Sequence, residues 1–238
     1  SFSNISFILH KPQLSENIGA CARALKNFNF KKLVIINPKP SFPNDKIFAT
    51  CVGAKDIINN SKIYENLEPA VKKVDYLIAT TSRYRNKNVK HINLNDLNKI
   101  DFDKKIAFLF GSEASGLSNN EISYANYTIQ IPANPEFKSL NLSHSLIIVA
   151  QVVANLIKLK KSNYSKSKKI KLASKKNIQS LANFCIKNLE DRNFFKPPEK
   201  KPIMLENLRS IFYKMELSEK ETRILSSVFA SLAKKKVD

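Results

Sequence analysis

Short apolar runs alternate with helical patterns over the first 160 residues of this chain, and that alternation restricts the fold more than any other feature. The runs typical of strands are Ile5–Leu9, Leu33–Ile36, Tyr76–Thr80, Ile106–Phe110 and Tyr127–Ile131. The segments typical of helices are Asn17–Phe28, Leu67–Val74, Ser118–Tyr124 and Leu142–Leu159. This pattern predicts an α/β domain in which helices cover a sheet. The last of these helices is apolar almost all round at its start, so we expect it to be buried against the sheet or another subunit.

Beyond residue 176 the pattern becomes purely helical. Apolar residues recur at three- and four-residue steps in the stretches 178–189, 205–215 and 224–232. Ser218 and Glu221 have the spacing of a capping box before the last of them. We therefore expect an α/β domain at 1–160, a Lys-rich linker at 161–176 and a small all-α domain at 177–238.

The formal net charge of +20 points to a polyanionic partner. Residues 1–160 hold 21 Lys and Arg against 12 Asp and Glu, whereas residues 161–238 hold 19 against 8. The stretch 158–176 contains nine lysines and no acid, which suits a phosphate backbone. A solvated linker would have the same composition, and this alternative stays open. A membrane surface suits the charge less well, because no amphipathic helix pairs these lysines with an exposed apolar face.

Neither a membrane span nor an export signal is expected. The longest apolar stretch, Leu146–Ile157, is shorter than the roughly 18 to 20 residues that a spanning helix needs. The three cysteines, Cys21, Cys51 and Cys185, are far apart and odd in number, so they predict neither a disulfide framework nor a metal site. We expect a cytoplasmic protein.

Glycine is scarce, and its positions exclude two common nucleotide-binding sites. The chain has only Gly19, Gly53, Gly111 and Gly116, from which neither GxGxxG nor GxxxxGK[ST] can be built. A Rossmann dinucleotide site and a P-loop are therefore excluded. Three of the four glycines lie instead in polar segments that follow predicted strands, where ligands of α/β proteins bind.

Three polar segments are candidates for the site. Asn17–Ala24 opens a helix and carries Arg23, whose planar guanidinium can hold a phosphate or a carboxylate. Phe110–Ser118 is a two-glycine loop that carries the carboxylate of Glu113. Ile131–Ser143 brings hydroxyl, amide and backbone groups to the start of the long apolar helix, where buried polar groups need partners. Taken singly, each segment also has an ordinary explanation: a surface arginine, a capped turn and a loop between elements.

In this order, the stretches NIGACARA, FGSEASGLS and IPANPEFKSLNLS resemble the three motifs of the SpoU/TrmH family of SPOUT methyltransferases. They are most similar to the motifs of TrmJ-type tRNA (cytidine/uridine-2′-O-)-methyltransferases. The resemblance extends to residues 79–85 and to the helical tail, so it covers nearly the whole chain. It departs from the family pattern at Ser112, at Ala114 and Ser115, and at Ser143 and His144.

The resemblance implies a SPOUT-type parallel sheet with a deep C-terminal trefoil knot, against the general rule that chains avoid threading. It also implies S-adenosyl-L-methionine as the cofactor, tRNA as the partner, and a homodimer whose knotted helices share the active site. By motif match, the cofactor-binding residues are Thr80, Thr81, Ser82, Gly111, Ile131, Ser139 and Leu140. The catalytic residues are Arg23, Ser139 and Asn141, and the substrate-binding residues are Asn17, Arg23, Arg83 and Glu113.

The implied reaction is 2′-O-methylation of a ribose in tRNA, at a pyrimidine at the start of the anticodon loop. Because arginine hardly ever deprotonates, we expect Arg23 to orient the ribose or a phosphate and to stabilise developing negative charge. Glu113 has an alternative, structural role in bonding backbone N–H groups of the knot. His10, His91 and His144 lack metal-ligand spacing, so no metal is expected. Two other functions stay open: rRNA 2′-O-methylation, and a non-catalytic RNA-binding protein on the same fold.

Overall fold

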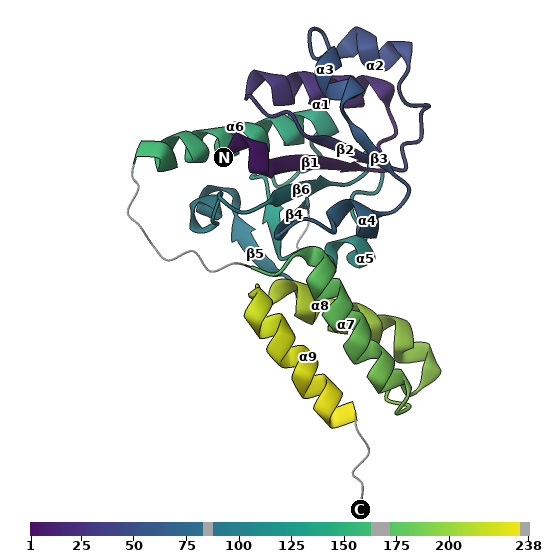
Figure 1. Ribbon diagram of the computed structural model, residues 1–238. Coiled ribbons are helices and arrows are strands. Elements are labelled where there is room, and N and C mark those ends of the chain that lie inside the picture. The colour runs from purple at the N-terminus through teal and green to yellow at the C-terminus, as the bar shows by residue number, and fades with distance from the viewer. Residues whose placement is uncertain (83–87, 163–171, 234–238) are drawn as a thin grey trace, which may run out of the picture.

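The computed structural model describes residues 1–82, 88–162 and 172–233 (Figure 1). Its centre is a seven-stranded sheet in which neighbouring strands are parallel. The strands are β1 (Ile5–His10), β2 (Leu33–Ile36), β3 (Lys62–Tyr64), β4 (Tyr76–Thr80), β5 (Lys90–Asn93), β6 (Ile106–Phe110) and β7 (Tyr127–Gln130). Their spatial order is β3-β2-β1-β6-β4-β7-β5. The predicted α/β class and the parallel sheet are confirmed.

The five strands predicted from apolar runs are all present, but the sequence missed the two edge strands. The central strands β1, β6 and β4 are buried along nearly their whole length, which explains their continuous apolar runs. β3 and β5 lie at the edges, and all their side chains are exposed or half-buried. Such short edge strands carry no apolar run that a sequence pattern can detect.

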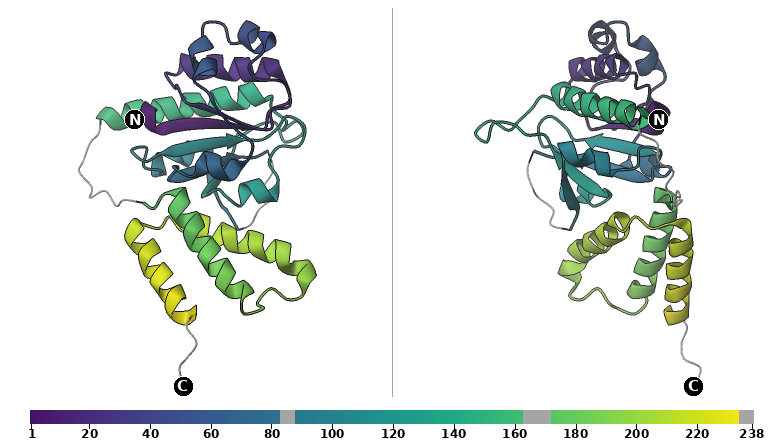
Figure 2. Two further views of the ribbon diagram at one scale, coloured as in Figure 1. Left: turned by 45° about the vertical axis from the view of Figure 1, so that its right-hand side comes forward. Right: turned by 90° about the vertical axis from the view of Figure 1, so that its left-hand side faces the viewer.

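Helices cover both faces of the sheet (Figures 1 and 2). On one face lie α1 (Ser15–Asn27), α2 (Asp45–Thr50), α3 (Lys55–Asn59) and α6 (Leu142–Ser162), which share the main apolar core with the sheet. On the other face, α4 (Leu67–Val71) and α5 (Asn119–Ile122) enclose a smaller apolar cluster. Short 3-10 helices occur at Phe2–Asn4, Leu94–Lys99 and Pro198–Lys200.

Two helices are shorter than their sequence patterns predicted. α5 begins after Ser118, whose hydroxyl accepts from Glu121 N–H while the Glu121 carboxylate accepts from Ser118 N–H. α4 ends at Val71, because the chain then turns at Val74 into β4. α6 begins as predicted and is 21 residues long. Even so, neither α6 nor any other helix in the described ranges is long and apolar enough to cross a membrane.

α1 and α2 approach each other closely at Gly19. A Cβ atom on residue 19 would lie 2.0 Å from Thr50 Oγ1 and 2.4 Å from the carbonyl oxygen of Ile47. No side chain fits there, so the glycine of the first motif allows the two helices to pack.

The C-terminal part forms a helical unit of α7 (Lys175–Glu190), α8 (Lys201–Lys214) and α9 (Glu219–Ala233), as the three apolar periods predicted. Both α8 and α9 pack against α7 around a small core of Ala173, Ile178, Leu181, Ala182, Phe212, Tyr213 and Leu217. The predicted capping box is confirmed, since Ser218 N–H donates to Glu221 over 2.6 Å and Glu221 N–H donates to the Ser218 hydroxyl over 3.2 Å. Residues 163–171 of the expected linker lie outside the described residues.

The helical unit is attached at the amino ends of β4 and β7. Tyr76, the first residue of β4, donates its hydroxyl hydrogen to Glu216 over 3.3 Å. Asn126, which precedes β7, donates to the carbonyl oxygen of Tyr213 over 2.7 Å. Its side-chain oxygen accepts from Lys175, so this lysine of the basic stretch is buried at the junction and does not face an RNA. In Figure 2 the helical unit lies below the sheet.

Candidate functional site

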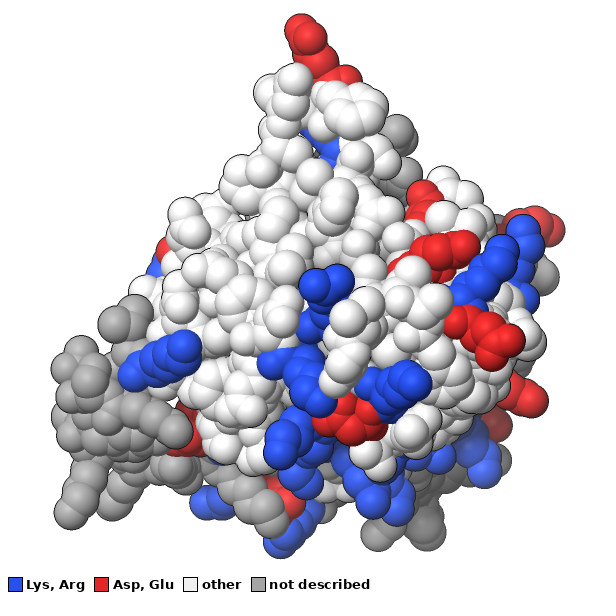
Figure 3. Space-filling view, turned by 90° about the horizontal axis from the view of Figure 1, so that it is seen from above, with Lys and Arg blue, Asp and Glu red and all other residues white. Residues whose placement is uncertain are grey.

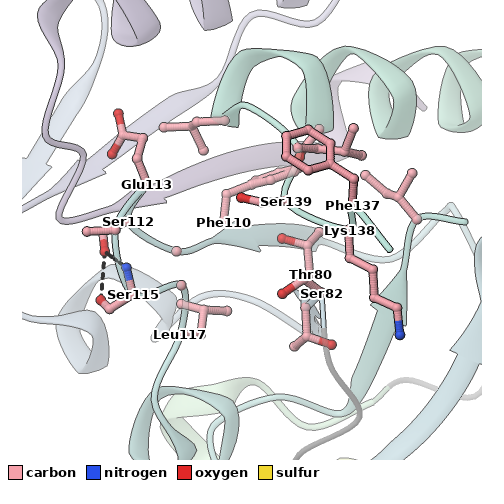
Figure 4. Close-up of a pocket in the computed structure, with 18 of the residues that line it drawn as sticks. Thr80, Ser82, Phe110, Ser112, Glu113, Ser115, Leu117, Phe137, Lys138 and Ser139 are labelled. Atoms are coloured by element: carbon pink, nitrogen blue, oxygen red, sulfur yellow. Dashed lines mark hydrogen bonds between the residues drawn. The ribbon is translucent and has the colours of Figure 1, made fainter. Parts of the chain in front are cut away.

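A cavity of about 480 Å³ opens beyond the carboxyl ends of β4, β6 and β7 (Figure 4). Thr80 and Phe110 end β4 and β6, and Ile131 follows β7, so the cavity lies where α/β proteins bind ligands. Its lining comes from Thr80–Ser82, Phe110–Leu117, Ile131, Pro135–Leu140, Leu142 and Ser145. The volume is within the roughly 300 to 1,000 Å³ of typical small-molecule sites.

The loop 111–117 folds back on itself and needs both of its glycines. A Cβ atom on Gly111 would lie 2.2 Å from the carbonyl carbon of Gly116, and Gly116 has a φ of +66°. Gly116 N–H donates to the carbonyl oxygen of Ser112 over 2.9 Å. The hydroxyl oxygens of Ser112 and Ser115 lie 2.9 Å apart (Figure 4). The result is a compact turn that forms one wall of the cavity.

The carboxylate of Glu113 joins this turn to the start of α1. One oxygen accepts from the backbone N–H of Gln13 over 2.8 Å. The other accepts from the backbone N–H of Leu14 over 3.3 Å and from the side-chain amide of Asn17 over 2.8 Å. N–H groups at a helix start lack partners within the helix, and the helix dipole favours an acid there. These contacts favour the structural role considered for Glu113.

Asn141 extends the same network to the third segment. Its amide nitrogen donates to the side-chain oxygen of Asn17 over 2.9 Å. Its own side-chain oxygen accepts from the backbone N–H of Ser143 over 2.8 Å and from the Ser143 hydroxyl over 2.7 Å, so Asn141 caps the first turn of α6. Glu113, Asn17 and Asn141 thus form a chain of hydrogen bonds that joins the three sequence segments beside the cavity.

Most of the predicted site residues lie in or beside the cavity. Those that line it are Thr80, Thr81, Ser82, Gly111, Glu113, Ile131, Ser139 and Leu140. Asn17 and Asn141 adjoin it through Glu113. Arg23 is exposed on α1 and is not part of the lining, and Arg83 lies outside the described residues. The roles of these residues remain predictions.

Two side chains at the rim of the cavity were not singled out from the sequence. Phe137 is 74% exposed, Lys138 is also exposed, and both line the cavity. Figure 4 shows them on the side opposite Ser112, Glu113 and Ser115. The sequence could have indicated both residues, because an aromatic residue stands beside a lysine in a motif loop. The loop has no helical or strand periodicity that would explain a phenylalanine there as a core residue.

The histidines do not gather into a metal site. His10 is buried 4.0 Å from Glu121; burial lowers the pKa of the imidazole, and the negative charge of Glu121 opposes this shift. His91 Nδ1 lies 3.1 Å from the Thr128 hydroxyl, and His144 is exposed. Over the described residues, no group of three or more His, Cys, Asp or Glu side chains could hold a metal ion.

Basic side chains gather on the face that carries α1, α2 and α3. Seen from above in Figure 3, Lys and Arg cluster over the lower half of this face, with fewer Asp and Glu between them. A surface of this sign attracts polyanions and accelerates their association.

Residues 4–151 match the SpoU rRNA Methylase family. The chain belongs to this family. The matched range contains the three motif segments and every residue that lines the cavity, so the resemblance carried by the motifs is confirmed.

Two relatives and one solved structure show how far the similarity of this chain extends. The tRNA (cytidine-2′-O-)-methyltransferase TrmJ of Sulfolobus acidocaldarius is 38% identical over 148 residues, which are 61% of this chain and 63% of that protein. The tRNA (cytidine/uridine-2′-O-)-methyltransferase TrmJ of Pectobacterium atrosepticum is 26% identical over 237 residues, 97% of each chain. The crystal structure of TrmJ from Z. mobilis ZM4 has a TM-score of 0.85 at 26% identity, covering 96% of this chain and 99% of that one. The chain thus spans less than two thirds of the Sulfolobus protein, whereas its similarity to the other two includes the helical unit.

Proposed function

We propose that this SpoU methylase transfers a methyl group from S-adenosyl-L-methionine to a ribose 2′-oxygen of tRNA, at a pyrimidine at the start of the anticodon loop. The observation that carries the proposal is the convergence of three motif segments on one cavity through the Glu113–Asn17–Asn141 hydrogen bonds. The Sulfolobus and Pectobacterium relatives, whose names give tRNA 2′-O-methylation, support it.

The lining of the cavity fits S-adenosylmethionine. Hydroxyl groups of Thr80, Thr81, Ser82 and Ser139 lie around it together with the apolar Ile131. An adenosine needs both kinds of surface, because its base has apolar faces and polar edges and its ribose carries hydroxyls. When bound, the cofactor would supply an electrophilic methyl group on a positively charged sulfur.

The transfer forms a carbon–oxygen bond while a carbon–sulfur bond breaks, and its electron pair stays with the sulfur. The 2′-oxygen must be aligned with the methyl carbon, and the hydroxyl proton must leave to a base or to water. Arg23 would orient the ribose or a neighbouring phosphate and stabilise negative charge on the oxygen. Ser139 and Asn141 would complete the site, one from the lining and the other from its capping position beside it.

Arg23 would act at the cavity of a second copy, because it is exposed and lies outside the lining of its own. This arrangement needs the homodimer implied by the motifs. α1 and α6 pack side by side on one face of the sheet (Figure 1). Three apolar residues of α6, Ile147, Ile148 and Val152, are only half-buried in the single chain, which suits a subunit contact. The dimer, the trefoil knot and the cytoplasmic location remain predictions.

The helical unit would contribute to holding the RNA. We assign RNA binding to residues 177–238 and keep 161–176 as the Lys-rich linker. Residues 177–238 hold 12 Lys and Arg against 8 Asp and Glu, and residues 161–176 add seven Lys and no acid. This positive charge supports the assignment, because lysines that neutralise phosphates release condensed counterions.

Purified protein incubated with methyl-labelled S-adenosylmethionine tests this function. We expect label in total tRNA and not in ribosomal RNA, and mapping of 2′-O-methyl positions should identify one pyrimidine of the anticodon loop. Label in ribosomal RNA alone would instead support the rRNA activity in the family's description. Label in neither RNA would support the non-catalytic RNA-binding alternative.

A further inference from the structure

Phe137 is held in an unusual position for a large apolar residue. Its side chain is 74% exposed, although phenylalanine is among the most often buried residues. The loop beneath it is ordered by its own hydrogen bonds: Phe137 N–H donates to the Asn134 carbonyl oxygen over 2.9 Å, and Glu136 N–H donates to the Asn134 side chain over 3.0 Å. A defined turn therefore presents the ring at the rim of the cavity.

Lys138 gives the same rim a positive charge. Both residues line the cavity, and in Figure 4 the Phe137 ring and the Lys138 amine point in different directions from one stretch of loop. A nucleotide offers matching groups, because its base stacks on an aromatic ring and its phosphate binds a cation. The rim is thus suited to a nucleotide next to the site of methyl transfer.

Two other occupants fit Phe137 less well. In the proposed dimer, the second copy would bring the cationic Arg23 towards this cavity, so it offers no anion to Lys138. The adenine of the cofactor would lie deeper, against the half-buried Ile131 and the buried Leu142, and would not need a ring that is mostly exposed.

We propose that Phe137 stacks on the base of the nucleotide that is methylated, and that Lys138 binds a phosphate beside it. The proposal rests on the proposed function and adds a determinant of specificity. A nucleotide that enters the cavity loses its stacked neighbours, and the Phe137 ring replaces one of them. Because every base has a π-face, this contact selects a nucleotide that is already unstacked in a loop and does not select a particular base.

Three substitutions at residue 137 distinguish stacking on a base from an apolar contact that any hydrophobic side chain could make. In the full-length protein, Phe137→Ala and Phe137→Leu should each lower kcat/KM for tRNA by about 10-fold or more, mainly through KM, whereas Phe137→Tyr should retain it. Leucine keeps the apolar contact that a subunit interface needs, so equal activity of the Leu and Tyr variants would overturn the proposal. A loss of S-adenosylmethionine affinity or of the native oligomeric state in Phe137→Ala would also overturn it.

A substrate with an abasic ribonucleotide at the mapped position gives the sharpest test. For the wild-type enzyme, kcat/KM on this RNA should be about 10-fold or more lower than on the intact RNA. For Phe137→Ala, kcat/KM should be the same on both RNAs, because the stacking contact is already absent. If the abasic position and Phe137→Ala each lower kcat/KM independently, the ring does not stack on this base. Lys138 is tested by the salt dependence of RNA binding. Lys138→Ala should reduce the slope of log K against log salt by about 0.7 to 0.9, whereas Lys138→Arg should leave it unchanged.

Failure of the proposed function is distinguishable from failure of this inference. If the wild-type protein methylates no RNA, the proposed function fails. The affinities of the wild-type and Phe137→Ala proteins for a tRNA anticodon stem-loop, measured by fluorescence anisotropy with S-adenosylhomocysteine present, then decide the role of the ring. Equal affinities would overturn it, and weaker binding by the variant would support it.

Discussion

The side-chain amide of Asn17 donates a 2.8 Å hydrogen bond to the carboxylate of Glu113, although 96 residues separate them in the sequence. Glu113 also accepts two backbone hydrogen bonds from the chain just before α1. Asn17 in turn accepts from Asn141 at the start of α6. The glycine turn, α1 and α6 are therefore held together by protein groups alone, and the cavity beside them is preorganised.

Replacing Glu113 is expected to destabilise the protein and to weaken cofactor binding. Glu113→Ala leaves two backbone N–H groups and the Asn17 amide without their acceptor, which should lower the free energy of unfolding by roughly 2 to 4 kcal/mol. Urea unfolding and calorimetric titration with S-adenosylmethionine measure the two effects. The exposed Glu65 offers a matched control, because Glu65→Ala removes the same charge from the surface. Equal stability of the two variants would contradict the structural role.

Arg23→Ala is expected to abolish transfer while S-adenosylmethionine still binds. Arg23 is outside the lining of the cavity, so its loss should leave cofactor affinity unchanged and lower kcat by about 100-fold or more, as for the loss of a charge-stabilising donor. Arg23→Lys keeps the charge but lacks the planar fork, and it should recover only part of the rate. Full turnover by the alanine variant would refute this role.

Neutralising lysines of the helical unit should weaken RNA binding and make it less sensitive to salt. Lys187, Lys196 and Lys214 are exposed, and replacing all three with Gln should reduce the slope of log K against log salt by up to about 2 to 3. Filter binding between 50 and 300 mM salt, chosen to cover roughly the range over which phosphate contacts lose affinity, measures the slope. Lys31, Lys32 and Lys62 are exposed on the other domain and provide a control with the same charge change. If the control substitutions reduce the slope equally, the helical unit is not the main RNA contact.

The buried Lys175 is expected to make stability depend on pH. It is 2% exposed, its amine donates to Asn126, and it lies 4.8 Å from the centre of the Tyr213 ring. Burial lowers the pKa of this amine well below its usual 10.5, and Asp75 opposes the shift only in part. The unfolded chain therefore binds the proton more readily than the folded one. Stability should fall as the pH falls from about 10.5 towards the lowered folded-state pKa, and the contribution is constant below it.

Lys175→Met should flatten this dependence, whose slope for one group is at most about 1.4 kcal/mol per pH unit. Methionine leaves no orphaned acceptor, because Leu77 N–H still donates to the Asn126 oxygen over 2.9 Å and Asn126 still donates to Tyr213. Urea unfolding at a series of pH values between neutral and alkaline gives the slope. Lys176→Met, at the exposed neighbouring position, is the control. The idea is wrong if both variants keep the slope of the wild type.

Much of the fold could be predicted because the central strands and the capping box of Ser218 and Glu221 leave local patterns. A strand buried on both faces must be apolar throughout, as β1, β4 and β6 are. The edge strands β3 and β5 leave no such pattern, because they are short and none of their side chains is fully buried. The sequence places Lys175 in a Lys-rich stretch and so suggests an exposed side chain, but in the fold its amine contacts Asn126 and Tyr213 and is buried.

The sequence by itself determined the family and the groups available for chemistry, since three ordered motifs supply the glycines, hydroxyls, amides and arginine. Only the tertiary structure decided which of them meet. β6 lies beside β1 in the sheet, so the turn that follows β6 reaches the start of α1 and Glu113 finds Asn17. The same geometry leaves Arg23 exposed outside its own cavity and sets Phe137 at the rim. Sequence periodicity reports local burial, whereas contacts between distant segments depend on the order of the strands, which no local pattern contains.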